Sequence, residues 1–214
     1  MKLVSVNVGL PRRVPWLADS VETGIFKEPV QDAVRLRRLN LDSDRQADLS
    51  VHGGPNRAAY VYPSEHYEFW RGELPGMELP WGVFGENFTT EGLLEESTHI
   101  GDRFRVGSAI VAVTQPRMPC YKLGIRFGRN DIIKRFLASG RTGFYLSVVE
   151  EGEVRAGDLV ESLAVDQDGV SVADIVQLYV ARNPDGALLR RAVDLVALPA
   201  SWRDYFAARL QQTS

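Results

Sequence analysis

The amino-acid sequence predicts a mostly β protein of the α+β class, in which a few helices cover the strands and three more helices end the chain. Three observations predict it. From residue 1 to about residue 163, apolar side chains recur with a period of two, as in Val4, Val6 and Val8. Glycine and proline turn signals separate these runs at short intervals. After the polar break at residues 165–169, the apolar period becomes that of a helix.

The first strand is predicted at the amino terminus, where apolar and polar residues alternate up to Gly9. Arg12 and Arg13 follow it, so this segment lacks the apolar block of a secretory signal. No run approaches the roughly 18 apolar residues that a spanning helix needs. The single cysteine excludes an internal disulfide. We therefore expect a cytoplasmic protein without a membrane segment.

Two helices are predicted to interrupt the strands. One follows Pro63 and Ser64 and carries Tyr67 and Trp70, and the other runs over about residues 131–139, from a capping aspartate to a glycine. Many short strands with such punctuation are typical of a barrel or a sandwich. The helices are expected to cover its openings.

The carboxy-terminal segment predicts a three-helix unit. Its first helix has the capping-box spacing of Ser171 and Asp174 and an apolar face. A second helix follows residues 183–185 and a third starts near Pro199. The second is expected to bury Leu188, Leu189, Ala192, Val193 and Val196. We predict a β domain over residues 1–164 and a helical domain over residues 165–214.

Charge is unevenly distributed along the chain. The formal net charge is -3, and residues 170–214 hold five arginines against four aspartates, so a nucleic-acid partner is not expected. Residues 117–141, however, contain seven cations and one acid. That window is either a solvated basic face or, around Arg117 and Lys122, an anion site.

Cys120 is the first candidate for chemistry. Pro116 and Pro119 predict an extended path out of a strand, which places the thiol on a loop at the strand end. A lone cysteine is most often a small buried apolar residue. Here Arg117 and Lys122 flank it and would stabilise a thiolate, which can attack an electrophile or bind a metal. The residues leave both roles open.

Two glycine-rich stretches add further candidates. His52 precedes Gly53 and Gly54, whose backbone can approach a ligand closely, and Arg57 offers donors for a phosphate or a carboxylate. The alternative is a simple turn between strands. In the second stretch, Glu86 either donates a proton or caps a turn, with the amide of Asn87 beside it.

Several common cofactors are not expected. The three histidines have no metal-ligand spacing, which argues against a zinc enzyme. No dinucleotide fingerprint or P-loop is present, so a nicotinamide, flavin or ATP site of the common types is not predicted.

Together these segments resemble the MOSC domain family, named for the carboxy-terminal domain of molybdenum cofactor sulfurase, and within it the YiiM-like branch. The resemblance covers almost the whole chain and is carried by residues 48–63 with Glu65, Tyr67 and Trp70, residues 85–89, 100–103, 115–122 and 142–145. The helical end resembles the 3-alpha domain of the same branch. One departure is Ser147, where this branch leads us to expect a basic residue.

The resemblance implies a MOSC-type β-barrel that binds the molybdenum cofactor, with Cys120 ligating molybdenum. A soft thiolate suits such a metal. The cofactor-binding candidates combine cations, backbone amides and one side-chain amide, namely Arg117, Lys122, Arg57, Gly53, Gly54, Asn87 and Arg141.

The same resemblance implies an oxidoreductase that reduces N-hydroxylated compounds such as hydroxylaminopurine to amines. Glu86 or His52 would supply protons, and a separate reductase would supply electrons, because one cysteine and no flavin site leave no electron carrier in the chain. Two alternatives are a metal-free enzyme with Cys120 as nucleophile and His52 as base, and a module that only carries the cofactor. A homodimer is also compatible with a barrel that has an exposed helical arm.

Overall fold

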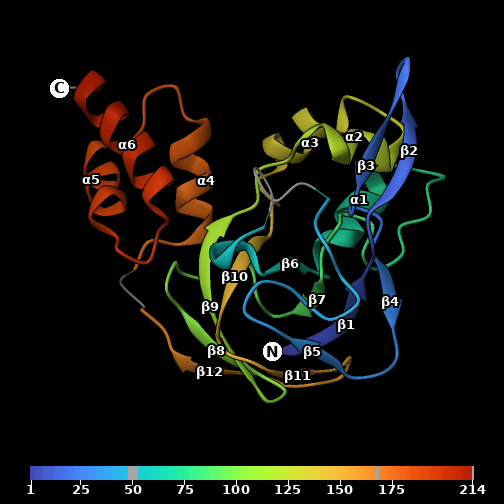
Figure 1. Cartoon of the computed structure of the whole chain (residues 1–214). Coiled ribbons are helices and arrows are strands. Elements are labelled where there is room, and N and C mark those ends of the chain that lie inside the picture. The colour runs from blue at the N-terminus through green and yellow to red at the C-terminus, as the bar shows by residue number, and fades with distance from the viewer. Residues whose placement is uncertain (48–52, 167–168, 214) are drawn as a thin grey trace.

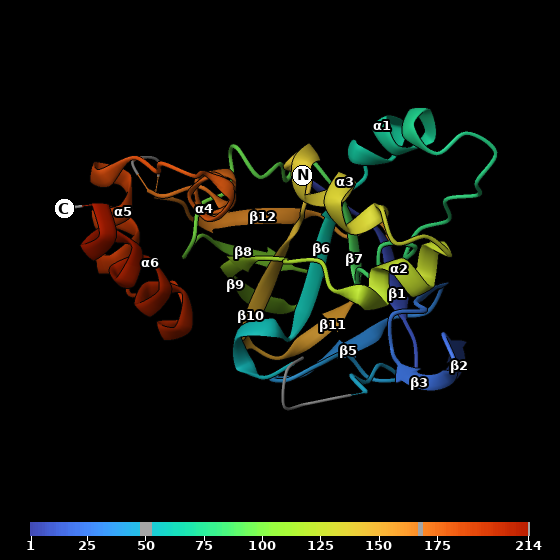
Figure 2. The same ribbon diagram turned by 90° about the horizontal axis from the view of Figure 1, so that it is seen from above.

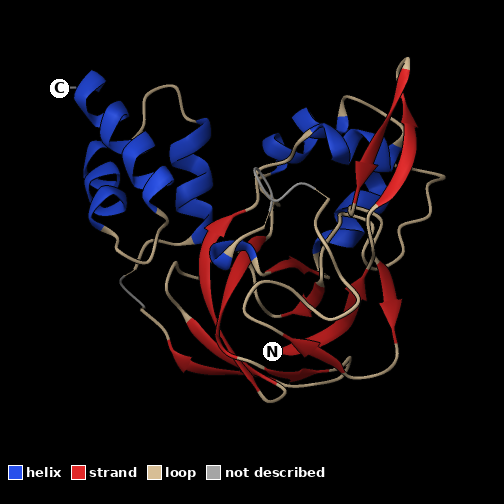
Figure 3. Cartoon of the chain, in the orientation of Figure 1, coloured by secondary structure: helices blue, strands red, loops and turns tan. Residues whose placement is uncertain are grey.

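The structure, a computed structural model, describes residues 1–47, 53–166 and 169–213. Its strands are β1 (Lys2–Val8), β2 (Arg12–Trp16), β3 (Asp19–Thr23), β4 (Glu28–Val30), β5 (Val34–Leu36), β6 (Ala59–Pro63), β7 (Phe88–Glu91), β8 (Arg103–Val106), β9 (Ala109–Pro116), β10 (Phe144–Glu150), β11 (Gly152–Val154) and β12 (Val160–Ala164). Its helices are the 3-10 turn η1 (Pro55–Arg57), α1 (His66–Glu73), α2 (Tyr121–Phe127), α3 (Ile132–Ser139), α4 (Val172–Val180), α5 (Gly186–Asp194) and α6 (Ala200–Thr213). The predicted mostly β class with a three-helix end is confirmed (Figure 3).

Eight strands form one sheet in the order β12-β8-β9-β10-β6-β7-β1-β4. Its pairs are antiparallel except β6 with β7, where Val61 lies opposite Phe88. The sheet curves until β1 meets the turn just before β12: the Leu3 amide donates to the Asp158 carbonyl at 2.9 Å, and the Gly157 amide donates to the Leu3 carbonyl at 2.7 Å. These bonds bring β1 to the chain that enters the first strand of the order, so one face of the sheet encloses a core.

Alternation along the strands explains which face is buried. In β9 the side chains of Ala109, Val111 and Val113 are buried, and those of Ile110 and Ala112 between them are only partly buried. The remaining strands form two small pairs, β5 with β11 and the β2–β3 hairpin, which projects beside the main sheet (Figure 2). Within the described residues, no helix combines the length and apolar character needed to cross a membrane.

A cluster of aromatic side chains fills the space between the sheet and α1–α3. The Phe84 ring stacks on Tyr62 with centroids 4.4 Å apart, and Phe136 stacks on Tyr62 and Trp70 at 5.9 Å. All four of these side chains are fully buried. The cluster therefore fixes β6 and the segment before β7, the two elements that frame one wall of the site described below.

The three carboxy-terminal helices pack together at one side of the molecule, apart from α1–α3 (Figure 1). Ser171 caps α4 as predicted: its hydroxyl accepts from the Asp174 amide and the Asp174 carboxylate accepts from the Ser171 amide, both at 3.0 Å. The buried side chains of these helices, Leu189 and Phe206 among them, are continuous with the core under the sheet. The prediction for Val196 was wrong, because α5 ends at Asp194 and Val196 is 84% exposed.

Candidate functional site

One solvent-open cavity of about 640 Å³ brings together segments that are far apart in the sequence. Its walls come from the end of the β2–β3 hairpin, the 44–47 loop, the η1 turn, the segment before β7, the loop before α2, and β10. Six of the predicted site residues line it, namely Gly53, Arg57, Asn87, Arg117, Cys120 and Lys122. Residues from three separate sequence segments, around positions 53–57, 87 and 117–122, therefore line the same cavity.

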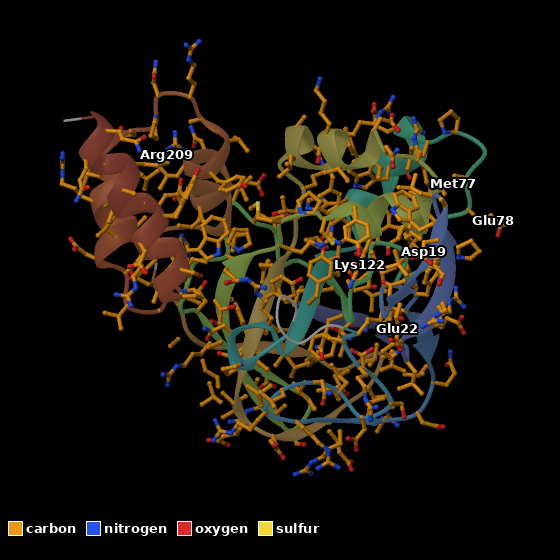
Figure 4. The ribbon with its side chains drawn as sticks, turned by 45° about the horizontal axis from the view of Figure 1, so that its top comes forward. Asp19, Glu22, Met77, Glu78, Lys122 and Arg209 are labelled. Carbon is orange, nitrogen blue, oxygen red and sulfur yellow. The ribbon has the colours of Figure 1, made fainter. Side chains whose placement is uncertain are left out.

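Cys120 lies where the sequence predicted, on the loop that leaves a strand. Pro116 is the last residue of β9, and Cys120 has extended backbone (φ −122°) immediately before α2. The thiol is partly buried at the cavity wall. Lys122, in the first turn of α2, lines the same cavity and is only 8% exposed. Figure 4 shows Lys122 in the central part of the molecule, apart from Arg209 on the three-helix end.

The cavity is strongly cationic. Among the described residues, five cations line it, Lys27, Arg45, Arg57, Arg117 and Lys122, against a single acid, Asp44. Lys27 and Asp44 form a buried ion pair with each other. The lining that the structure describes therefore carries an excess of positive charge beyond this ion pair, so the cavity favours an anionic ligand.

Arg117 is the most buried of the cations that line the cavity, at 5% exposed. Its guanidinium carbon lies 5.2 Å from the Tyr60 ring centroid and 5.1 Å from that of Phe136. Burial opposes the charge, yet the pKa of Arg117 is raised, because Tyr60, Tyr145 and Cys120 favour the cationic form. Its Nη1 is buried without a hydrogen-bond partner among the described residues. This donor suits an anion in the cavity.

Asn87 lines the cavity, but its amide is occupied by the protein. Its Nδ2 donates to Asp44 at 3.0 Å and to the Asn7 carbonyl at 3.3 Å, and its Oδ1 accepts from the Tyr60 amide at 3.1 Å. Asn87 therefore joins three walls of the site.

Glu86 does not face the cavity, where a proton donor to a bound substrate would have to lie. It is fully buried and is not among the cavity-lining residues. Its carboxylate accepts from the Gly82 amide at 2.8 Å, the Phe84 amide at 3.1 Å and the Thr89 hydroxyl at 3.0 Å, and also from the Tyr67 hydroxyl. Burial raises the pKa of Glu86. These bonds support the alternative role of capping the turn before β7.

Replacing Glu86 with glutamine is expected to lower the free energy of unfolding by about 1–3 kcal/mol, because the amide NH₂ would face a backbone N–H donor that now has a carboxylate oxygen. Urea unfolding measures it. Glu68→Gln is the control: Glu68 pairs with Arg71 on the exposed face of α1, so its loss should change stability by less than about 1 kcal/mol. Unchanged stability with an altered pH profile of activity would restore the proton-donor role.

Two other predicted residues, Arg141 and Gly54, lie away from the cavity lining. Arg141 does not line the cavity: its guanidinium carbon lies 4.1 Å from the Phe69 ring centroid and its Nη1 donates to the Ser139 carbonyl at 3.1 Å. Gly54 precedes η1 with φ 87° and is also outside the lining. His52 lies outside the described residues. Ser147, the departure from the branch, donates to the Ala112 carbonyl at 3.4 Å and is not at the cavity.

Several residues that line the cavity were not predicted as site residues. Lys27, Asp44 and Arg45 belong to the first 47 residues, where no motif marks them. Tyr60 and Tyr145 fall inside segments that the resemblance covers, but no role was assigned to them. Tyr145 packs on Tyr60 at 5.4 Å, and burial raises its pKa, although the nearby Arg117 and Arg57 lower it. The signal for Tyr60 and Tyr145 was their position within residues 48–63 and 142–145, two of the segments that carry the family resemblance.

Comparison with known proteins agrees with this architecture. Residues 48–161 match the MOSC domain model, and residues 170–213 match that of the YiiM-like 3-alpha helix domain. The chain is 42% identical over 206 residues to "Uncharacterized protein YflK" of Bacillus subtilis (strain 168), covering 95% of this chain and 92% of the relative. It is 36% identical over 182 residues to "Protein YiiM" of Escherichia coli (strain K12), covering 84% and 81%.

A more distant relative and a solved structure complete the comparison. A protein named "Reductase" from Gibberella moniliformis (strain M3125 / FGSC 7600) is 31% identical over 84% of this chain, which spans 32% of that relative. The crystal structure of YiiM from Geobacillus stearothermophilus superimposes with a TM-score of 0.82 at 32% identity, covering 98% of both chains. The chain therefore belongs to the MOSC domain family and carries the YiiM-like 3-alpha helix domain at its carboxy-terminal end.

Proposed function

We propose that this chain binds a molybdenum cofactor in the cationic cavity, with Cys120 as a ligand of the metal, and reduces N-hydroxylated compounds to amines. Membership of the MOSC family and the relative named reductase support an oxidoreductase-like function. The observation that carries the proposal is the placement of the thiol in a cavity whose described lining holds five cations and one acid.

The residues of the cavity fit the cofactor. Its phosphate needs cations and hydrogen-bond donors. Arg57 from η1, Arg117 directly after β9 and Lys122 from the first turn of α2 supply them at the cavity. The buried Nη1 of Arg117 gains an acceptor if a phosphate oxygen lies beside it. Cys120 contributes the soft sulfur ligand that such a metal binds well.

The reduction breaks the N–O bond of an N-hydroxylated amine, forms an N–H bond and releases water, and it consumes two electrons and two protons. When bound, the molybdenum centre supplies two-electron chemistry and an acceptor for oxygen. The chain positions the substrate and supplies protons. Tyr145 lines the cavity, and because burial raises the pKa of its phenol, the hydroxyl keeps its proton at neutral pH. It can therefore donate a hydrogen bond to the leaving hydroxyl.

Electrons must come from outside this chain, because it has a single cysteine and so cannot hold a cysteine-ligated iron–sulfur cluster by itself. A separate reductase is the proposed partner. The Gibberella relative supports a link of this kind, since this chain corresponds to about a third of a longer protein named reductase.

The test is reduction of hydroxylaminopurine by cofactor-loaded protein, with a chemical donor or a reductase as the source of electrons and the amine quantified as product. Failure to reduce any N-hydroxylated substrate would overturn the proposal. Activity that survives removal of the cofactor would identify Cys120 as a nucleophile instead. Stoichiometric transfer of cofactor without turnover would identify a carrier.

Substituting Arg117 with glutamine is expected to weaken retention of the cofactor by roughly 10–100-fold, the loss that a hydrogen-bonded charge accounts for. Pterin content after dilution and gel filtration measures it. Arg141→Gln is the matched control, because Arg141 lies over Phe69 outside the cavity and should leave retention unchanged. Equal loss of cofactor in Arg117→Gln and Arg141→Gln would show that the effect is not specific to the cation in the cavity.

A further inference from the structure

A second group of cations lies along the seam between the β2–β3 hairpin and α2, which stand side by side in Figure 1. Arg12 and Trp16 are four residues apart on β2 and share one face of the strand. The Trp16 ring packs on Tyr121, the first residue of α2, with centroids 6.3 Å apart. At the other end of the seam, Arg12 approaches Arg126 in the last turn of α2.

Two guanidinium groups share one aromatic ring there. The guanidinium carbon of Arg12 lies 3.8 Å from the Phe26 ring centroid, and that of Arg126 lies 5.1 Å from the same centroid. The two charges repel: burial is the main cause that lowers the pKa of Arg126, and the charge of Arg12 lowers it further. Cation–π contact with one ring does not neutralise two cations.

Among the residues that the structure describes, no carboxylate forms an ion pair with Arg12 or Arg126. Glu28 and Glu86 are near enough to favour the charge of Arg126, but within the described part of the chain neither forms an ion pair with it or with Arg12. Glu86 is already engaged by backbone amides and hydroxyls.

Arg126 also has a buried donor. Its Nε has no hydrogen-bond acceptor among the described residues and is shielded from solvent. A buried N–H without an acceptor is destabilising, and so is the approach of two like charges. An oxyanion relieves both, because its oxygens accept from the planar donors of guanidinium groups and its charge offsets theirs.

We propose that Arg12 and Arg126 form a binding site for an oxyanion, a phosphate or carboxylate group of a small molecule, in the seam between β2 and α2. This site is separate from the cavity, because neither arginine lines it. Phe26 lies between Ile25 and Lys27, which do line the cavity, whereas Phe26 does not. The seam and the cavity thus contact different residues of one segment. This proposal does not depend on the proposed function.

The test titrates inorganic phosphate, and acetate in a parallel arm, into cofactor-free protein by calorimetry at constant ionic strength. Saturable binding of phosphate, acetate or both is expected in the parent protein, and the two arms tell a phosphate site from a carboxylate site. Arg12→Gln and Arg126→Gln should each weaken that binding about tenfold or more. Arg13→Gln is the control, because the neighbouring residue points to the other face of β2 and is exposed.

Two further measurements distinguish binding at the seam from binding in the cavity, and loss of the site from loss of the fold. Arg117→Gln removes the buried cation of the cavity and should leave binding at the seam in place. Without added anion, Arg126→Gln should melt at the same temperature as the parent or higher, because the substitution removes the repulsion. The proposal is overturned if the parent shows no saturable binding at millimolar anion, or if Arg12→Gln and Arg126→Gln bind as tightly as the parent.

Discussion

Cys120→Ala is expected to give a folded protein that has lost nearly all of its molybdenum, a decrease of at least about tenfold in metal per chain. The reason is that the other charged side chains around the thiol are mostly cations, which cannot ligate a metal. Within the described residues, no group of three or more histidine, cysteine, aspartate or glutamate side chains could hold the metal instead. Molybdenum and pterin are measured in protein made in a cofactor-competent cell.

Cys120→Ser is the companion variant, because it keeps the size and polarity of the side chain but replaces the soft sulfur with a hard oxygen. Both variants should lose metal, while Arg57, Arg117 and Lys122 still retain part of the pterin through its phosphate. Stoichiometric molybdenum in Cys120→Ala would exclude the thiol as a ligand. If the parent also fails to bind added cofactor, the nucleophile hypothesis takes its place.

The three-helix end was predictable because its signals are local. The capping box needs only Ser171 and Asp174, three residues apart, and the apolar period of α4 extends over a single segment. The strands were predictable in kind for the same reason, since alternation such as that of β9 is visible within eight residues. The order of the strands in the sheet depends on pairing across the chain, which no local pattern encodes.

Helix α2 was not predicted, and the cause is its length. It spans seven residues directly after Pro119 and Cys120, which is too short for a helical period to be recognised. The loop that holds Cys120 was predicted, because two prolines exclude regular structure there. The thiol was therefore placed correctly at a strand end, although the helix that positions Lys122 beside it was missed.

The site was predictable where short motifs carry its chemistry. Arg57, Arg117 and Lys122 each lie within three residues of a glycine, a proline or the thiol in the sequence. The structure brings all three to one cavity. Glu86 shows the limit of this reasoning, because a carboxylate in a glycine-rich turn can either face the cavity or bind the backbone of the turn. Only the packing of Phe84 and Tyr67 around that turn decides between them.

The ion pair of Lys27 and Asp44 is expected to give the largest effect on stability. Its side chains are 7% and 1% exposed, and Asp44 also accepts from the Gly9 amide at 2.9 Å and from Asn87 at 3.0 Å. Asp44→Asn leaves Lys27 as a buried charge without its partner, which should cost about 3–5 kcal/mol. For a chain of this size, that lowers the melting temperature by roughly 6–20 °C. Differential scanning calorimetry measures the change.

The chain provides a matched control two residues away. Asp42 pairs with Arg37 through two oxygens, but these side chains are 46% and 54% exposed, so Asp42→Asn should cost less than about 1 kcal/mol. Equal effects of Asp42→Asn and Asp44→Asn would show that burial of the second pair is not the cause.

A double variant separates the buried charge from the hydrogen bonds of Asp44. In Lys27→Met with Asp44→Asn no charge is left unpaired, so the double variant should be more stable than Asp44→Asn alone. A double variant at least as unstable as the single one would assign the loss to the bonds with Gly9 and Asn87. Because Lys27, Asp44 and Asn87 come from three walls of the cavity, the ion pair that stabilises the fold also holds these walls together.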